Sequence, residues 1–169
     1  MDILPEILNR KSVRHFSAKA VGKETLRRIL EAGVRAPSAK NRQEWRFIAV
    51  VKEDVRRRLQ EAAFGQEHVG QAAAVIAACT TNIDYRMPNG QLSYPLDITF
   101  ALSFMMLQAV HEGLGTCCVT TFDEQEAKEI LTIPFSMRVV MLLLVGHPAG
   151  KTEPAGRKPF KRCVSYDHW

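Results

Sequence analysis

The sequence predicts an α+β domain, because two kinds of segment share one chain. Amphipathic helical patterns alternate with short apolar runs that are rich in β-branched residues. The chain has 169 residues, of which 46% are hydrophobic and 24% are charged. That composition is ordinary for a globular protein, and a chain of this length is expected to bury about 70% of its unfolded surface. We therefore expect a single domain over residues 1–169.

The first half of the chain alternates helical and strand patterns. The strongest helical pattern covers residues 23–35, where apolar residues recur three and four apart, and Pro37 ends it. Further helices are expected over residues 3–10 and 53–63, with an irregular stretch or a single helical turn over residues 65–71. Strands are expected over residues 46–51 and 72–79.

Residues 95–112 form the longest predicted helix, which is apolar nearly all round. A helix of that kind is buried on most sides. One domain of this size has difficulty covering it, so we infer that a second subunit helps. Next we expect a strand over residues 116–121, a helix over 123–131 that opens with a capping-box spacing, and a strand over 139–145.

The last residues, 149–169, are polar and basic and have no core of their own. They end on Tyr166 and Trp169, two large side chains that need a surface to bury against. We expect this tail to wrap around the partner subunit of a homodimer.

The net charge, the cysteines and the distribution of apolar residues indicate which ligands and which cellular location to expect. The formal net charge is +5, which favours anionic ligands such as nucleotides, nucleic acid or phosphate-bearing cofactors. The four cysteines show neither a C-x-x-C motif nor zinc spacing, so we expect no metal site and a reducing, cytoplasmic location. Asp2, Glu6 and Arg10 argue against a signal peptide, and no apolar run approaches the roughly 18 residues of a membrane span.

The stretch from Arg10 to Phe16 places cations and a hydroxyl ahead of an aromatic residue. These residues alone leave two interpretations open. Either this is a solvated turn whose cations cover the surface, or Arg10, Lys11 and Ser12 hold a phosphate while Arg14 reaches a second electron-rich atom. Arginine suits phosphate because its planar fork donates two parallel hydrogen bonds.

Polar side chains also gather in the loop over residues 36–45. Ser38, Asn41 and Gln43 are short groups that either cap a helix or read the edge of a flat heterocycle. The loop over residues 85–94 fits a mobile flap over a site and equally an ordinary surface excursion. The sequence holds no dinucleotide fingerprint, no P-loop and no nucleophile elbow, and we assign no catalytic side chain.

Four motifs, taken in order, resemble those of the FMN-dependent nitroreductase family. Residues 10–16 resemble its opening R-x-S-x-R-x-F, and residues 36–47 resemble its A-P-S-x-x-N-x-Q-P-W-x-F, with Glu44 in place of the usual proline. The other two matches are to its central G-L-G to F-D-E stretch, over residues 113–118, 122–124 and 131–134, and to its ending, over residues 144–148 and 157–160. The resemblance implies a three-layer sandwich, in which helices flank a central, mostly antiparallel sheet, and an intertwined homodimer with two sites at its interface.

The resemblance also assigns residues to the cofactor. Arg10, Lys11 and Ser12 would bind the phosphate and ribityl chain of FMN, with Arg157 or Lys158 reaching the same phosphate.

The flavin ring would be contacted by a second group of residues. Arg14 would lie near its N1/O2 edge, where a cation stabilises negative charge, and Gln66 would contact the pyrimidine edge. Thr120 and Thr121 would place backbone groups near N5 and O4. The residues that would line the ring from the other subunit are Pro37, Ser38, Ala39 and Asn41.

The implied activity is that of a ping-pong reductase, in which NAD(P)H is the electron donor and a nitroaromatic, quinone or related small molecule is the acceptor. One alternative keeps the flavin but changes the reaction to reductive dehalogenation or flavin breakdown. A remote alternative is a basic nucleic-acid-binding module. We disfavour it because Phe100 and Phe104 are expected in a buried helix and are not interleaved with basic residues. We therefore expect neither nucleic acid nor membrane as a partner.

Overall fold

A four-stranded antiparallel sheet lies at the centre of the protein. The computed structural model describes residues 3–153 and 155–169, so Asp2, which was used in the argument on targeting, lies outside the described residues. The strand order is β1-β2-β4-β3, and each neighbouring pair is antiparallel. The strands are β1 (Trp45–Val50), β2 (Ala74–Thr80), β3 (Gly115–Val119) and β4 (Arg138–Gly146).

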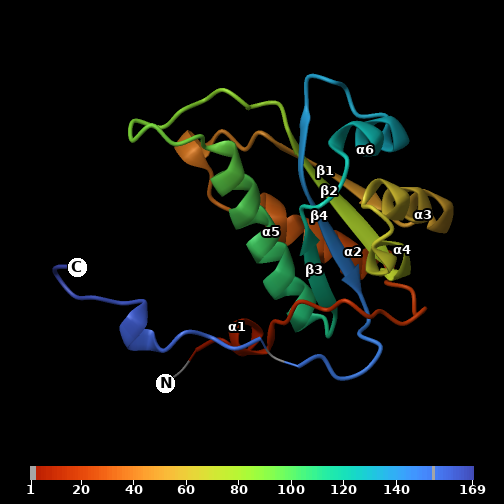
Figure 1. Ribbon diagram of the computed structural model, residues 1–169, viewed down its shortest axis with the longest axis horizontal. Coiled ribbons are helices and arrows are strands. Elements are labelled where there is room, and N and C mark those ends of the chain that lie inside the picture. Colours follow the sequence, from red (N-terminus) through yellow and green to blue (C-terminus); the bar gives the residue numbers. More distant parts are fainter. Residues whose placement is uncertain (1–2, 154) are drawn as a thin grey trace.

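Helices cover both faces of this sheet (Figure 1). One face carries α2 (Lys23–Val34) and α5 (Tyr94–His111), and the other carries α3 (Glu53–Ala62), α4 (Glu67–Gln71) and α6 (Glu124–Leu131). The short α1 (Pro5–Asn9) lies against the end of α5, where Glu6 Oε1 is 3.0 Å from His111 Nδ1. Two 3-10 turns complete the described elements, η1 (Ala39–Asn41) and η2 (Phe160–Arg162). The predicted α+β sandwich is confirmed.

The two core layers follow from the alternation of side chains along the central strands. Val75 and Ala77 of β2 pack with α3, α4 and α6, whereas Ala74 and Ile76 face α2 and α5. All residues of β2 are buried. A strand that is covered on both faces reads as a continuous apolar run, which is why β2 and β4 stand out in the sequence.

A single glycine allows α2 and α5 to approach closely. A Cβ atom at Gly33 would lie only 2.1 Å from Cε of Met105. The side chain of Met105 on α5 occupies the space that a side chain at position 33 would fill. Glycine on the apolar face of α2 thus lets the two helices pack into one layer.

The outer face of α5 is left uncovered by residues 3–153 and 155–169. Leu96, Phe100 and Phe104 recur at four-residue spacing, and Phe100 and Phe104 are 47% and 40% exposed. The prediction that these two phenylalanines are buried is therefore wrong for the single chain, because no described element lies over them. Leu4, the N-cap residue of the neighbouring α1, and Leu8 of that helix are also exposed, so an apolar surface continues from α5 onto α1.

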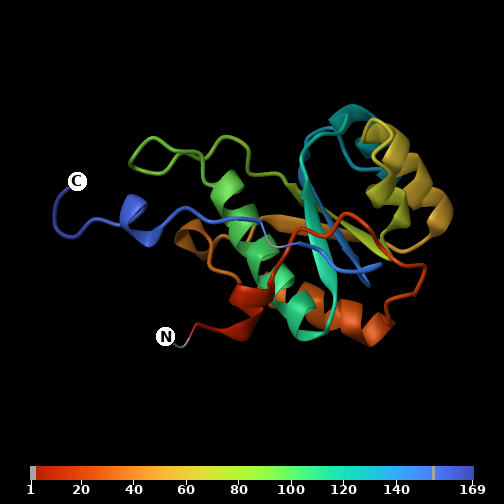
Figure 2. The same ribbon diagram turned by 60° about the horizontal axis from the view of Figure 1, so that its bottom comes forward.

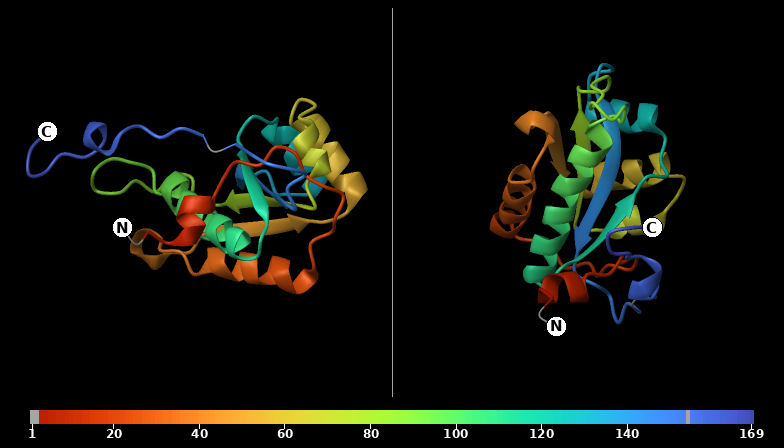
Figure 3. Two further views of the ribbon diagram at one scale, coloured as in Figure 1. Left: turned by 90° about the horizontal axis from the view of Figure 1, so that it is seen from below. Right: turned by 90° about the vertical axis from the view of Figure 1, so that its left-hand side faces the viewer.

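The C-terminal tail extends away from the layers (Figures 2 and 3). Residues 155–169 are all exposed, and none of them belongs to either core cluster. The chain exposes 10733 Å² of surface, whereas a compact protein of this mass exposes about 8,400 Å². The excess agrees with the prediction of a tail that lacks a core of its own. Among the described helices, none is both long and apolar enough to cross a membrane.

Candidate functional site

The N-terminal segment, residues 10–16, is fixed along β3 by backbone pairing. Ser12 forms a parallel bridge with Thr116, and the Val13 N–H donates to the Thr116 carbonyl at 2.9 Å. Val13 and Phe16 are buried in the core, whereas the polar residues between and before them are exposed or half-buried. The apolar residues thus anchor the segment and leave its polar groups outside.

Two glycines make room for this segment. A Cβ at Gly115 would lie 2.4 Å from Cγ2 of Val13, and a Cβ at Gly146 would lie 2.8 Å from Cδ1 of Phe16. Both distances are shorter than side chains tolerate. The glycines in the G-L-G and V-G-H-P motifs therefore have a packing role that their spacing in the sequence did not reveal.

The cations of the N-terminal segment differ in what they contact. Arg10 and Arg14 form no side-chain hydrogen bond or ion pair with any residue that the structure describes. Lys11 Nζ donates to the Thr152 carbonyl at 2.8 Å, which places the start of the tail beside the segment.

The charges of Arg14 and Arg10 act on the two cysteines of β3, Cys117 and Cys118. Burial raises the pKa of Cys117, and Arg14 acts in the opposite direction. Partial loss of hydration and the neighbouring Cys117 raise the pKa of Cys118 to about 11 although the residue is exposed, against an opposing effect of Arg10. Arg10 and Arg14 flank the two residues that pair with Thr116, and this pairing places both arginines beside β3.

The end of β3 meets the turn between α3 and α4. The strand stops at Val119, so Thr120 and Thr121 follow the strand and are exposed, whereas the sequence placed them inside it. Gln66 Nε2 donates to the Thr121 carbonyl at 2.7 Å and to the Ala63 carbonyl at 2.9 Å. The structure therefore brings Gln66 and Thr121 together.

His68, for which the sequence predicts no role, is the second residue of α4 and lies two residues after Gln66. Burial lowers its pKa, and the charges of Arg14 and His15 lower it further. The imidazole of His68 therefore lies where the positive charge of the N-terminal segment acts on it. No spacing rule relates residue 68 to residue 14, so only the fold reveals this proximity.

The loop over residues 36–44 lies at the opposite edge of the sheet. It leads into β1, whereas the N-terminal segment lies on β3, and three inter-strand spacings of about 14 Å in total separate these outer strands. Pro37, Ser38, Ala39 and Asn41 are therefore not brought together with Arg10 and its neighbours within one chain.

The side chains of this loop maintain its own shape. Ser38 Oγ accepts the Gln43 N–H at 3.0 Å, and Asn41 Oδ1 accepts from Gln43 Nε2 at 2.9 Å. Ser38 makes no side-chain cap to η1. Lys40, Asn41 and Gln43 all have φ of 53°, in the left-handed region, which costs a non-glycine residue about 1 kcal/mol or more.

Arg157 and Lys158 lie in the exposed tail. Arg157 Nη1 donates to the carbonyls of Ala155 and Gly156 at 3.1 and 3.3 Å, so it contacts only its own stretch of chain. Neither residue contacts the N-terminal segment within the described chain. The same described residues hold no group of three or more His, Cys, Asp or Glu that is suited to a metal ion.

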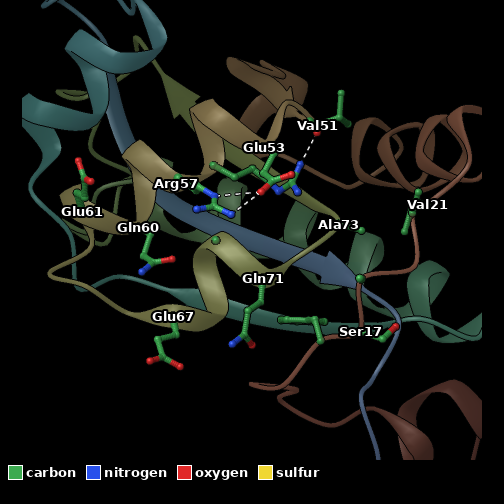
Figure 4. Close-up of a pocket in the computed structure, with 15 residues that line it drawn as sticks. Ser17, Val21, Val51, Glu53, Arg57, Gln60, Glu61, Glu67, Gln71 and Ala73 are labelled. Carbon is green, nitrogen blue, oxygen red and sulfur yellow. Dashed lines mark hydrogen bonds and ion pairs between the residues drawn. The ribbon is translucent and has the colours of Figure 1, made fainter.

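A separate groove of about 820 Å³ lies between α3, α4 and residues 16–21 (Figure 4). None of the predicted site residues lines it. Its arginines already have partners: Arg57 pairs with Glu53 at 2.6 Å, and Arg56 donates to the Val51 carbonyl. We therefore do not assign the predicted site to this groove.

Comparison with known proteins places the chain in a family. The model of the nitroreductase family matches residues 7–92 and 66–147. An NADH dehydrogenase of Thermus thermophilus is 29% identical over 97% of this chain and 95% of its own length. An NAD(P)H-dependent FMN reductase of Bacillus subtilis is 25% identical over 94% of this chain and 70% of its own length.

A solved structure gives the same result. A nitroreductase family protein from Clostridium novyi NT superposes with a TM-score of 0.81 and 31% identity, over 88% of this chain and 86% of that one. The match of the family model, which spans most of the chain, agrees with the sheet order and the motif-bearing segments described above. The chain therefore belongs to the nitroreductase family and is an oxidoreductase.

Proposed function

We propose that this protein is an FMN-dependent NAD(P)H oxidoreductase that reduces nitroaromatic, quinone or related small acceptors by a ping-pong mechanism. The observation that carries this proposal is the N-terminal segment, where Arg10 and Arg14, which have no side-chain partner among the described residues, are held on a backbone frame paired to β3. The relatives include an NAD(P)H-dependent FMN reductase, which supports the same cofactor and donor.

The donor groups of this segment suit the phosphate of FMN. Arg10 and Ser12 stand on a segment fixed to β3, so they are positioned before any ligand arrives, and arginine binds phosphate with two parallel hydrogen bonds. Lys11 would contribute its charge while its ammonium remains bonded to the Thr152 carbonyl. Arg157 and Lys158 follow in the same tail and are proposed to reach the phosphate from it.

The other residues would hold the ring. FMN, when bound, supplies the hydride chemistry that no side chain of this protein offers. Arg14 would stabilise negative charge at the pyrimidine edge, where the reduced ring carries it. Gln66 would be the neighbouring contact, and its bond to the Thr121 carbonyl fixes the backbone that follows β3, where Thr120 also lies.

The site is proposed to be completed by a second copy of the chain, in a homodimer. Pro37, Ser38, Ala39 and Asn41 lie at the opposite sheet edge from the N-terminal segment, so they would line the ring bound by the other copy. The exposed apolar surface of α1 and α5 and the tail without a core are surfaces that such a dimer would bury. We propose that the protein acts in the cytoplasm.

The proposal is tested with the purified full-length chain. We expect a yellow protein that releases FMN on denaturation, oxidises NADH or NADPH when a nitroaromatic or a quinone is added, and has the mass of a dimer in light scattering. A colourless protein that FMN does not reconstitute would contradict the proposal. Reduction of bound FMN without turnover of either acceptor class would contradict the assigned reaction and favour dehalogenation or flavin breakdown.

A further inference from the structure

The 36–44 loop adopts an unfavourable backbone path that other elements must stabilise. Three of its residues, Lys40, Asn41 and Gln43, have positive φ. Such conformations persist only where surrounding contacts determine them, and they gather at ligand sites. The bonds inside the loop, from Ser38 and Asn41 to Gln43, fix its internal shape but not its position on the protein.

Besides the bond from the Ala36 N–H to the Gly33 carbonyl at the end of the preceding helix α2, two hydrogen bonds join this loop to other elements in the described chain. Thr80 Oγ1 donates to the Glu44 carbonyl at 2.8 Å, where the loop enters β1. Asp97 Oδ1 accepts the Ala39 N–H at 2.8 Å. Only the Asp97 bond reaches the middle of the loop, next to Ser38, and it spans 58 residues of sequence.

Asp97 is unusual for a charged side chain because it is only 9% exposed. It is the fourth residue of α5, and its own N–H donates to the Ser93 carbonyl. Its carboxylate caps no N–H of α5, and within the described chain it forms no ion pair. A buried carboxylate with a single backbone partner loses much of its hydration, so an apolar residue would serve better if packing were its only role.

We infer that Asp97 is a positioning residue of the proposed flavin site. By holding the Ala39 N–H, it sets the path of residues 37–41, which are proposed to line the ring bound by the second copy. The inference rests on the proposed function. It assigns Asp97 the role of a hydrogen-bond acceptor rather than that of a charge near the helix terminus.

The residues that follow Ala39 make a second set of contacts, with the ring of Tyr85. Lys40 and Arg42 both lie over the ring of Tyr85, with Nζ at 5.3 Å and Cζ at 4.7 Å from its centroid. Tyr85 belongs to the excursion between β2 and α5. A displaced Ala39 would therefore loosen the loop, together with its attachment to the neighbouring excursion.

Two substitutions separate the acceptor role from the charge. Asp97→Asn keeps an oxygen at the same place and removes the charge, whereas Asp97→Ala removes both. Glu124→Ala is the matched control, because Glu124 Oε1 on the other face of the sheet accepts the Val139 N–H at 2.9 Å and also joins two elements.

The first measurement needs no cofactor. Trypsin cleaves after lysine and arginine, and Lys40 and Arg42 are both exposed. We expect Asp97→Ala to speed cleavage at these two sites about tenfold, and the masses of the fragments identify the sites. The Ala39 N–H loses its acceptor in this variant, so the displaced conformation of the loop, which trypsin can cleave, should be about tenfold more populated. Asp97→Asn should resemble the wild type, and Glu124→Ala should lower the melting temperature without favouring these sites.

The second measurement follows FMN binding by quenching of flavin fluorescence. We expect Asp97→Ala to raise the Kd for FMN about tenfold and to raise KM for the acceptor more than it lowers kcat, with Asp97→Asn within about threefold of the wild type. Equal effects of Asp97→Ala and Glu124→Ala, or of both Asp97 variants, would overturn the inference alone. A wild type that binds no FMN would overturn the proposed function and the flavin role of Asp97 with it.

Discussion

The two halves of the proposed site are built in opposite ways. The N-terminal segment, residues 10–16, is held by backbone pairing to β3 and by buried Val13 and Phe16, and among the described residues its arginines have no side-chain partner. The 36–44 loop is held by side chains and has a left-handed backbone, and its cations already lie over Tyr85. The N-terminal segment therefore presents unpaired positive charge, whereas the 36–44 loop presents a nearly neutral surface whose backbone shape is fixed.

This difference suggests a division of labour. A phosphate needs unpaired positive charge on a fixed frame, whereas a flat ring needs short polar groups at set positions. The two halves lie at opposite sheet edges, so each copy of the chain would bring one half to each of two sites. The predictions below alter one half at a time.

The largest effect is expected from Gly115→Ala, which removes the space for Val13. The added Cβ would lie 2.4 Å from Val13 Cγ2, so the N-terminal segment must move. We expect the free energy of unfolding to fall by up to about 3 kcal/mol and FMN to be lost on purification. Gly22→Ala is the control: nothing lies within 4 Å of its Cβ and its φ is −64°, so no clash arises, and the loss of the glycine N-cap of α2 should cost less than about 1 kcal/mol in chemical denaturation.

Arg10→Ala should weaken the charged half without changing the fold. Loss of a charge-assisted bond to phosphate costs about 2 kcal/mol, which corresponds to a roughly thirtyfold higher Kd for FMN in a fluorescence titration. Riboflavin, which lacks the phosphate, should bind both proteins equally. Arg58→Ala, on the exposed side of α3, should leave both affinities unchanged. Equal losses for FMN and riboflavin would show that Arg10 does not contact the phosphate.

Tyr85→Ala should affect the loop half by a smaller amount. Each cation over an exposed aromatic ring contributes about 0.5–1 kcal/mol, so the loop loses about 1 kcal/mol of support. We expect a severalfold rise in KM for the acceptor in steady-state assays, with a rise in the Kd for FMN that is smaller than the one caused by Asp97→Ala. Tyr85→Phe keeps the ring and should behave as the wild type. If Tyr85→Phe were as impaired as Tyr85→Ala, the hydroxyl and not the ring would be responsible.

The smallest effect concerns neither half. Arg28 donates two hydrogen bonds of 2.7 Å to Glu112, and these lower the pKa of Glu112 from 4.5 to about 2. A lowered folded pKa gives stability that is present above the unfolded value and is lost as the pH falls toward the folded value. The stability difference between the wild type and Glu112→Gln should therefore shrink between pH 4.5 and pH 2 in urea titrations. A constant difference would mean that the pair is not linked to protonation.

Much of the fold was predictable because its signals are local. The apolar spacing around Leu26 and Ile29 identified α2, and the continuous apolar runs identified β2 and β4, which are buried on both faces. The absence of a single apolar stripe on α5 predicted that a second subunit helps to cover it, and the single chain does leave Phe100 and Phe104 exposed.

The arrangement of the site was harder to predict from the sequence because it depends on contacts between residues that are far apart in the chain. The place of Asp97 near the start of α5 suits the helix dipole, but no local pattern in the sequence shows that its carboxylate accepts the Ala39 N–H across 58 residues. Gly115 and Gly146 belong to sequence motifs, but the motifs do not show why glycine is needed there. Glycine is needed because Val13 and Phe16 pack against these two positions. Ser38 was read as either a helix cap or a ring contact; its hydroxyl does not cap a helix but accepts the Gln43 N–H.

The central claim is that each site combines the N-terminal segment of one copy with the 36–44 loop of another. The direct test co-expresses two differently tagged chains, one carrying Arg10→Ala and Arg14→Ala, the other Ser38→Trp, and isolates mixed dimers with both tags. Each variant alone should bind no FMN, whereas the mixed dimer should bind about one FMN per two chains, because one of its two sites is intact. A mixed dimer without FMN, or no mixed dimer at all, would contradict the account.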